Sequence, residues 1–448
     1  MPLFPSRAVR SGARSGVRLD GASWRYTVAM LVDATGSGMY LPLSLLYFHY
    51  VTGLALPAVG ATMTVAALLG MVSNPLAGIL VDRYGARAVV IGGYLLRAVG
   101  FAGYLLVHSQ AEMFLAVVLV AFGDRTFPPS IQALISEISQ GTARDRLIAR
   151  QRSLRNAGLG LGGLTASALL GLGHDGAYHL VVGLDAASFV LAALLIASVP
   201  SVASARGAGR PSRRGGYRTV ARDRCFVRLT LVNAPLALCY MTLSTVLPVY
   251  LTQSLHTSAA VPGLLYGVNT VGIALVQVPL GRLIVRRRRN RTAALGGAVF
   301  AASFLLFAAS ALLPGPGPLL GCLFLATGLY TTGELLHSPG ASALAAGSAP
   351  AELRGRYMAL YQLSWALPSA AAPTLFTVGL TVSPTGLWLL LTALAGGSAL
   401  ALLRMERLLP DAAVRPWTRD AAPAPEAVPA TSLPTPAATA VSPAGSRS

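Results

Sequence analysis

Of the 448 residues of the chain, 54% are hydrophobic and only 11% are charged, whereas soluble domains carry about 25% charged residues. This composition excludes an ordinary water-soluble globule. The net charge is +19, but the 35 basic residues are all arginines in short clusters between apolar runs. No basic face with interleaved aromatic residues is present, which argues against nucleic acid as a partner. The three cysteines are isolated and lack the spacing of a metal site.

Apolar runs of about 20 residues, the length that crosses a hydrocarbon core of about 30 Å, predict twelve transmembrane helices. The predicted fold class is therefore an all-α polytopic membrane protein. In the first half of the chain we expect helices at residues 26–47, 56–81, 88–107, 113–135, 154–172 and 178–199. In the second half we expect them at residues 226–251, 261–285, 292–313, 319–345, 357–378 and 385–403.

The connections between these helices alternate in charge. Those that follow odd-numbered helices contain no arginine, whereas those that follow even-numbered helices are rich in it. Because positively charged loops stay in the cytoplasm, the arginine-rich connections and both termini are predicted to be cytoplasmic. The first 25 residues contain no apolar core, so we expect no cleavable signal peptide and insertion of the first helix directly into the cell membrane.

Changes of composition divide the chain into five segments. Residues 1–25 form a basic cytoplasmic tail, residues 26–199 the N-terminal six-helix half, residues 200–225 a basic cytoplasmic linker and residues 226–404 the C-terminal six-helix half. Residues 405–448 turn to proline, alanine, serine and threonine, which cannot bury enough apolar surface to fold. This tail is predicted to be disordered.

The two halves contain an internal repeat. The string GDRTFPPSIQAL begins at Gly123 and GELLHSPGASAL begins at Gly333, so that a glycine, an acid, a proline, an alanine and a leucine recur at an offset of 210. The same offset aligns the pattern R-x-R-x-x-A at Arg144 with the one at Arg354. Because six crossings return the chain to the same side, such halves are related by an axis along the membrane normal.

The segment GILVDRYGAR follows the predicted second helix. Its patterned residues are Gly78, Asp82, Arg83, Gly85 and Arg87. The segment resembles the signature loop between helices two and three of the major facilitator superfamily, and with the helix count and the basic linker the resemblance covers roughly residues 26–403. It implies that these residues form a gate. Gly85 would permit a tight turn, and Asp82 would pair with an arginine or a helix N-terminus across the cytoplasmic seam between the halves. The alternative is that the loop only fixes topology.

A finer resemblance is to the bacterial drug:proton antiporter branch of that superfamily. It rests on Asp33 followed by Gly36 and Gly38, on RNAGLGLGG in helix five and on GELLHSPG in helix ten. The Gly-Pro pair of the antiporter signature is replaced by Gly162-Gly163. Export and uptake therefore both stay open.

Charged residues inside a membrane need a partner, a water-filled cavity or a function, because each costs about 2.5–3.5 kcal/mol at the bilayer centre. Those within the predicted helices are Asp33, Arg97, Asp124, Arg125, Asp185 and Glu334. The resemblance places Asp33, Asp124 and Glu334 on cavity-lining helices. Burial favours the neutral form of a carboxyl group, so these three acids are candidates for proton coupling, with His337 one turn from Glu334. The alternatives are static ion pairs with Arg97 or Arg125 and a packing role for His337. Asp185, on a peripheral helix, is interpreted as structural.

Polar and aromatic side chains on the cavity helices are candidates for substrate contact, and interhelical packing explains them equally well. They are Tyr40, Asn233, Tyr240, Asn269, Tyr361, Gln362 and Trp365. The leading hypothesis is a monomeric secondary-active exporter of amphipathic or cationic small molecules, embedded in membrane lipids and driven by the proton gradient without a cofactor. Transport of a specific metabolite and a non-transporting receptor or scaffold are the alternatives. The chain has no motif for ATP hydrolysis and no GxSxG or HExxH, so no enzyme chemistry is predicted.

Overall fold

The computed structural model describes residues 21–138, 141–172, 176–199, 217–284, 287–350 and 353–415. These residues form helices joined by short turns, and no β-strand occurs among them. The predictions for residues 1–20, 200–216 and 416–448 lie outside the described residues.

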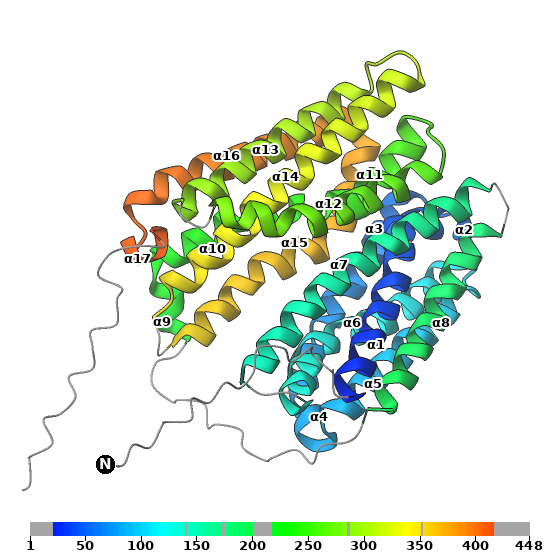
Figure 1. Ribbon diagram of the computed structural model, residues 1–448. Coiled ribbons are helices and arrows are strands. Elements are labelled where there is room, and N and C mark those ends of the chain that lie inside the picture. Colours follow the sequence, from blue (N-terminus) through cyan, green and yellow to red (C-terminus); the bar gives the residue numbers. More distant parts are fainter. Residues whose placement is uncertain are drawn as a thin grey trace, which may run out of the picture.

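The N-terminal half is a bundle of helices (Figure 1). Its elements are α1 (Gly21–Tyr40), the 3₁₀ turn η1 (Leu41–Leu43), α2 (Ser44–Thr52), α3 (Leu56–Gly70), α4 (Ser73–Tyr84), α5 (Ala86–Tyr104), α6 (Gln110–Ile138), α7 (Gly141–Gly171) and α8 (Ala177–Ala197). α1, η1 and α2 follow one another as a single rod, and α3 and α4 form another that is interrupted by a short turn. The half therefore consists of six rods.

The C-terminal half repeats this arrangement. It begins with the short helix α9 (Tyr217–Arg222), and its first rod is α10 (Arg224–Cys239), the π-helical turn η2 (Thr242–Val246), α11 (Leu247–Val249) and a second π-helical turn, η3 (Tyr250–Ser254). The other rods are α12 (Ala260–Ile284), α13 (Arg289–Ser310), α14 (Pro316–Ser348), α15 (Arg354–Val382) and α16 (Pro384–Arg404). The short elements η5 (Met405–Arg407) and α17 (Asp411–Val414) follow.

Nine helical stretches in the described part of the chain are long and apolar enough to cross a membrane. The three other predicted spans correspond to the α1 rod, the interrupted α3–α4 rod and α7, whose first half is rich in charged residues. Every predicted span is thus a helical rod, and the all-α membrane fold is confirmed.

Three of the predicted helices are interrupted, and a proline lies at each interruption. The first predicted helix passes through the 3₁₀ turn η1, which contains Pro42. The second predicted helix is interrupted by a turn at Met71 and Val72. Pro75 follows four residues after Met71 and cannot donate a hydrogen bond to its carbonyl group. The seventh predicted helix forms π-helical turns on both sides of Pro248, which likewise lacks a backbone donor for the preceding turn of the helix.

The C-terminal tail begins later than predicted. Residues 405–415, which we expected to be disordered, pack beneath the C-terminal half. Glu406 forms ion pairs with Arg288 and with Arg291, the latter at 2.8 Å, and Ala413 is fully buried. Composition alone could not reveal this contact, because the partner arginines lie more than a hundred residues earlier in the chain.

The molecule has two chemically distinct ends. The turns around residues 83–87, 287–291 and 354–356 lie at the end marked by α4 and α9, which we call the arginine-rich end. The opposite end, marked by α2 and α11, is called the arginine-free end. Figure 1 shows that the two halves diverge toward the arginine-rich end.

The halves meet mainly toward the arginine-free end. α7 packs along α12, where Ser167 Oγ donates to the carbonyl oxygen of Ala260 at 2.7 Å. α3 packs along α15, where Thr374 Oγ1 donates to Thr64 Oγ1 at 2.8 Å. Glycine permits close approach at both contacts, since a Cβ on Gly263 would lie 2.7 Å from the carbonyl oxygen of Gly163 and one on Gly60 would lie 2.5 Å from that of Pro373.

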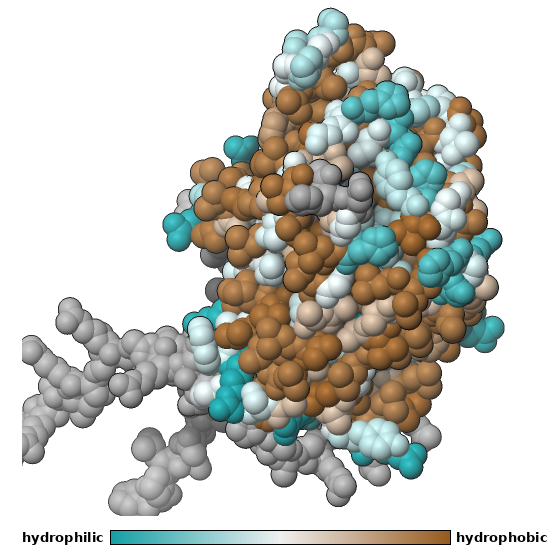
Figure 2. All heavy atoms as spheres, turned by 90° about the vertical axis from the view of Figure 1, so that its right-hand side faces the viewer, coloured by the Kyte–Doolittle hydropathy of each residue, from teal (hydrophilic) through white to brown (hydrophobic). Residues whose placement is uncertain are grey.

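The outer surface is suited to a lipid environment. Figure 2 shows that hydrophobic side chains cover much of one flank. Exposed leucines occur on both halves, for example Leu106 at 71% and Leu275 at 71% exposure. In water such a surface would drive aggregation, whereas in a bilayer it faces acyl chains.

Candidate functional site

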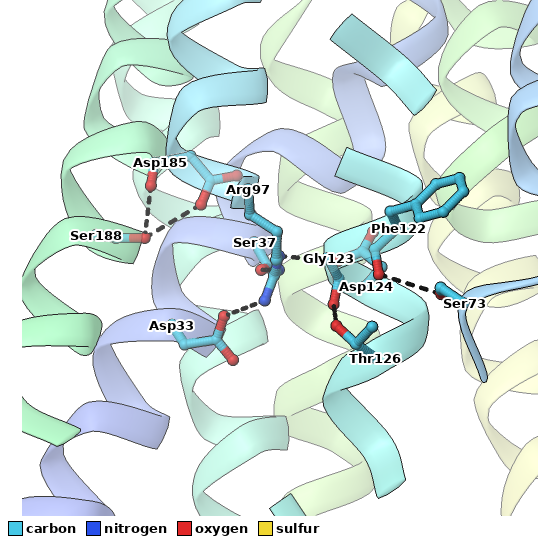
Figure 3. A network of polar contacts seen from close by, with 10 residues as sticks. All are labelled: Asp33, Ser37, Ser73, Arg97, Phe122, Gly123, Asp124, Thr126, Asp185 and Ser188. Atoms are coloured by element: carbon cyan, nitrogen blue, oxygen red, sulfur yellow. Dashed lines mark hydrogen bonds and ion pairs between the residues drawn. The ribbon is translucent and has the colours of Figure 1, made fainter. Parts of the chain in front are cut away.

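The N-terminal half contains an ion-pair network centred on Arg97 of α5 (Figure 3). Arg97 Nη1 donates to Asp33 Oδ1 of α1 at 3.0 Å, and its Nε lies 2.8 Å from Asp124 Oδ1 of α6. Its Nη2 donates to Ser37 Oγ at 3.2 Å. One guanidinium group therefore holds two of the three predicted coupling acids and links three helices near their midpoints.

Small residues make room for this arginine. A Cβ on Gly123 would lie 2.5 Å from Arg97 Cγ, so the glycine beside Asp124 allows α5 and α6 to approach with the arginine between them. On the opposite side, the guanidinium carbon lies 3.8 Å from the ring centroid of Phe189 on α8. This distance is typical of a cation–π contact, which stabilises a desolvated arginine.

The network is buried at one end and accessible at the other. The side chains of Asp33 and Arg97 are 5% and 9% exposed, whereas that of Asp124 is 50% exposed. Exposure of an acid near the middle of a spanning helix distinguishes Asp124 from its buried partners. Asp124 is thus the member of the network that a solute can reach.

The charge partners predicted from the sequence differ in their placement. Arg97 is an ion-pair partner, as expected. Arg125 is not paired with any described carboxylate, and its Nη2 instead lies 3.4 Å from Ser369 Oγ on α15, across the interface between the halves. Although Arg125 is adjacent to Asp124 in sequence, a helix turns successive side chains by about 100°. The two therefore face different neighbours.

The C-terminal half contains a network of neutral groups around Glu334 of α14. Asn269 Nδ2 donates to Glu334 Oε2 at 2.7 Å and to Thr331 Oγ1 at 3.0 Å. No arginine pairs with Glu334 among the described residues. This acid is therefore held by an amide rather than by a cation.

His337 lies next to this acid and is fully buried. Tyr240 Oη lies 3.1 Å from His337 Nδ1 and 3.1 Å from the carbonyl oxygen of Glu334. The hydroxyl has one hydrogen, so both contacts are satisfied if it donates to the carbonyl while Nδ1–H of His337 donates to it. Nε2, which has no partner among the described residues, is then a free proton acceptor.

Three further predicted substrate contacts, Asn233, Tyr361 and Trp365, contact other side chains of the C-terminal half. Asn233, Tyr361 and Ser364 form a closed hydrogen-bonded set in which Asn233 Nδ2 donates to Ser364 Oγ at 2.8 Å and Tyr361 Oη donates to Asn233 Oδ1 at 3.0 Å. Trp365 packs edge-on against Tyr240, with ring centroids 5.0 Å apart.

The remaining two predicted contacts are placed very differently from each other. Gln362 is exposed. Tyr40 is buried against Phe101, 4.7 Å away between ring centroids, and against Tyr104. The packing alternative describes Tyr40 better than substrate contact does.

The predicted gate loop forms the turn between α4 and α5. Gly85 adopts φ 84°, a left-handed value that favours glycine. Arg87 Nε donates to the carbonyl oxygen of Ile196 at 3.3 Å, and its Nη2 donates to Ala197, so this arginine caps the C-terminus of α8 within its own half.

Asp82 does not make the predicted contact in this conformation. Its side chain is exposed and forms no ion pair with a described residue, because the halves diverge at this end. Arg83 lies over the ring of Tyr84, 5.4 Å from its centroid, and a Cβ on Gly78 would meet no atom within 4 Å. The loop is thus in a released state.

Sequence reasoning missed three polar residues of this region. Ser37 lies one turn after Asp33, a spacing that could have identified it as a second contact for Arg97. Ser188 contacts Asp185 on α8, at 3.2 Å from Oδ1. Arg155, which the helix-five motif included without a role, is exposed, forms no ion pair with a described residue and acts electrostatically on Asp124. Nothing in one sequence indicated its orientation.

Comparison with known proteins places the chain in a family. The model of the Major Facilitator Superfamily matches residues 26–373. The chain belongs to the major facilitator superfamily. It is thus a multi-pass membrane transporter, and the family is one of transporters rather than of enzymes.

Relatives in this superfamily include proteins named Multidrug resistance protein MdtH. The one from Aeromonas hydrophila is 28% identical over 346 residues, which cover 77% of this chain and 84% of the relative. The one from Cronobacter sakazakii is 29% identical over 373 residues, which cover 82% and 90%.

Solved structures of the superfamily share the fold. A peptide transporter POT in complex with alafosfalin aligns with a TM-score of 0.70 at 18% identity, over 88% of this chain and 97% of that one. The nucleoside transporter NupG aligns with a TM-score of 0.71 at 13% identity, over 86% of this chain and 100% of that one.

Proposed function

We propose that this transporter exports amphipathic or cationic small molecules from the cytoplasm in exchange for protons. The observation that carries the proposal is the half-exposed carboxylate of Asp124, which lies near the middle of α6 and is held by one buried arginine. A lipophilic cation can compete with Arg97 for that carboxylate. The relatives named multidrug resistance proteins support the same substrate class.

The proposed orientation follows from the arginine distribution. Positively charged loops stay in the cytoplasm, so the arginine-rich end and both termini are cytoplasmic in the cell membrane. The halves contact each other toward the opposite end and diverge at the arginine-rich end. The conformation described is then the inward-facing state of an alternating-access cycle, with the Asp82 loop released.

Glu334 is the proposed proton site of the C-terminal half. It is held by neutral donors only, so it can lose and regain a proton without leaving a buried arginine unpaired. Asp124 can exchange a proton only by giving up its pair with Arg97. The two halves would thus differ: substrate cation and Arg97 compete for a carboxylate in the N-terminal half, and an acid held by neutral donors exchanges a proton in the C-terminal half.

Everted membrane vesicles with a proton gradient test this function. Cationic dyes, neutral amphipaths, amphipathic anions and polar metabolites are added in turn while internal pH is followed with a pH-sensitive dye. We expect proton release with several lipophilic cations. Release with one polar metabolite alone would favour the specific-metabolite alternative, and a pH that does not change with any compound would contradict proton-coupled export.

The orientation has a separate test. In a chain whose native cysteines have been replaced, single cysteines at Ser109 and Gly176 should react with an impermeant maleimide in whole cells, and one at Ser212 should react only after the cells are broken. The reverse pattern would invert the proposed orientation.

A further inference from the structure

Asp185 of α8 is a buried acid that the proposed cycle does not use. Its side chain is completely buried against α1 and α5. A Cβ on Gly36 of α1 would collide with Asp185 Oδ1 and with Ser188 Oγ. The glycine therefore admits these polar groups between the two helices, which indicates a built site rather than an accidental charge.

The hydrogen bonds of Asp185 fit a neutral acid. Ser188 Oγ can donate to the backbone carbonyl oxygen of Asp185 at 2.8 Å or to its Oδ1 at 3.2 Å, and because it has a single hydrogen the shorter contact to the backbone is favoured. Oδ2 has no partner among the described residues. A carboxylate is only an acceptor and would have no committed donor here, whereas a protonated carboxyl group can donate from Oδ1 to Ser188 Oγ.

Arg97 lies within reach of this acid. Phe189, the ring under the Arg97 guanidinium group, is four residues after Asp185 and so shares its helix face. Figure 3 shows Asp185 beside Arg97, on the side away from Asp124. A change of the Arg97 side-chain torsions can therefore exchange Asp124 for Asp185 while the pair with Asp33 is kept.

The charged and titratable groups around Asp185 are unbalanced. Those that face it from the packed helices are Asp33 and Tyr40 of α1, Tyr104 and Arg97 of α5, and Asp124 of α6. α7 meets α8 through apolar side chains such as Leu170 and Val181. Arg155 and Arg125 act on the charge of Asp124, whereas Arg97 is the one arginine that acts on Asp185, and it is engaged by Asp33 and Asp124. Asp185, the acid without an ion-pair partner among the described residues, is therefore most stable with a proton.

We propose that Asp185 is a proton-carrying site of the transport cycle, protonated while Arg97 binds Asp33 and Asp124 and deprotonated when a cationic substrate takes Asp124. In the second state Arg97 pairs with Asp185, the O–H bond of Asp185 has broken and its proton has passed to water. The net charge of the site is the same in both states, because one cation enters as one proton leaves. This inference rests on the proposed function.

Infrared spectroscopy of the full-length protein in liposomes tests the protonation of Asp185. We expect the C=O stretch of a protonated carboxyl group at neutral pH, lost in Asp185→Asn and kept in Glu112→Gln, whose exposed acid lies at the start of α6. In case Asp185→Asn fails to fold, Ser188→Ala keeps the acid, removes its partner and should shift the band. A band unchanged in either Asp185→Asn or Ser188→Ala overturns the proposal.

Addition of tetraphenylphosphonium tests the exchange. The Asp185 band should disappear as this lipophilic cation binds wild-type protein, and a band that persists at saturation overturns the proposal. Uphill transport by Asp185→Asn should fall at least tenfold, and wild-type transport by this variant would also overturn it. The two proposals can fail separately. If the Asp185 band is lost on tetraphenylphosphonium binding but everted vesicles show no proton-coupled transport, Asp185 is still an exchange site and only the proposed function is contradicted.

Discussion

The two halves share a fold and a repeat, but they hold their membrane acids in opposite ways. In the N-terminal half, Asp33 and Asp124 are bound to one buried arginine, Arg97. In the C-terminal half, Glu334 is bound to an amide and lies next to a neutral histidine network. A duplicated scaffold has thus acquired one site that a cation stabilises and one that needs no cation.

This difference has an energetic consequence. Removing one partner of a buried ion pair leaves the other charge uncompensated and costs about 3–5 kcal/mol, whereas replacing a neutral-bonded group by an isostere costs far less. The N-terminal network should therefore determine stability as well as function. The C-terminal network should affect function while leaving the fold intact.

The largest expected effect is that of Arg97→Gln, which leaves buried carboxylates without their cation. We expect it to lower the free energy of unfolding by about 3–5 kcal/mol and to reduce the yield of folded protein sharply, as measured by thermal unfolding in detergent. Arg125→Gln is the matched control, because that side chain lies 3.4 Å from Ser369 Oγ and forms no ion pair with a described residue. Adding Asp33→Asn to Arg97→Gln should restore part of the loss. Equal unfolding temperatures for the two arginine variants would contradict the comparison.

The next effect is that of Glu334→Gln, which should fold normally and lose accumulation driven by a pH gradient while retaining downhill exchange. A neutral amide fills the site but cannot cycle a proton. Proteoliposomes with an imposed pH gradient provide the measurement, with Glu112→Gln as the control for loss of an exposed acid. If Glu334→Gln and Asp33→Asn both sustain wild-type uphill transport, the coupling role of these acids is wrong and static pairing is the better account.

Asp82→Asn should have a smaller effect on rate. In the conformation described, Asp82 is exposed and unpaired among the described residues, so the substitution costs this state nothing. It would remove a contact of the outward-facing state, in which the arginine-rich ends close. We expect transport to slow several-fold with substrate binding unchanged, while Asp411→Asn, an exposed acid at the same end, transports normally. If Asp82→Asn transports at the wild-type rate, the loop only fixes the topology of the chain and does not form a gate.

The sequence was sufficient for the architecture because the membrane imposes it. Apolar length and arginine alternation predicted the helical rods, and the repeat around Gly123 and Gly333 predicted two related halves. The breaks near Met71 and Pro248 were missed because a hydropathy pattern ignores the donors that proline removes. Residues 405–415 were missed because their partners lie far away in the sequence.

The sequence indicated which charged residues lie inside the membrane but not which of them pair with each other. Intramembrane charge, together with the cavity placement that the family resemblance implied, selected Asp33, Asp124 and Glu334 as candidates, with Arg97 as a possible partner. Which acid Arg97 holds depends on the rotation of each helix about its axis. Asp124 and Arg125 are adjacent in the sequence, but their side chains point about 100° apart around α6 and therefore contact different neighbours. Asp185 was assigned to the periphery, since only the packed structure shows that α8 places it beside Arg97.

The smallest expected effect compares two buried tyrosines, one in each half. Tyr240 Oη contacts His337 Nδ1 and the carbonyl oxygen of Glu334, both at 3.1 Å, whereas Tyr94 Oη is buried without a partner among the described residues. A neutral hydrogen bond contributes about 0.5–1.5 kcal/mol. Tyr240→Phe should therefore lower the unfolding free energy by about 1 kcal/mol, and Tyr94→Phe should leave it unchanged or raise it.

The same pair of variants separates stability from coupling. Tyr240→Phe also frees His337 from its orienting hydroxyl group, so uphill transport should fall by a smaller factor than in Glu334→Gln, measured in the same proteoliposomes. Tyr94→Phe leaves the Arg97 ion pairs in place and should transport at the wild-type rate. If Tyr240→Phe is less stable yet accumulates substrate like the wild type, His337 only packs, and proton exchange in the C-terminal half depends on Glu334 alone. If Tyr94→Phe is the less stable of the two, the hydrogen bonds of Tyr240 contribute less to the fold than their geometry indicates.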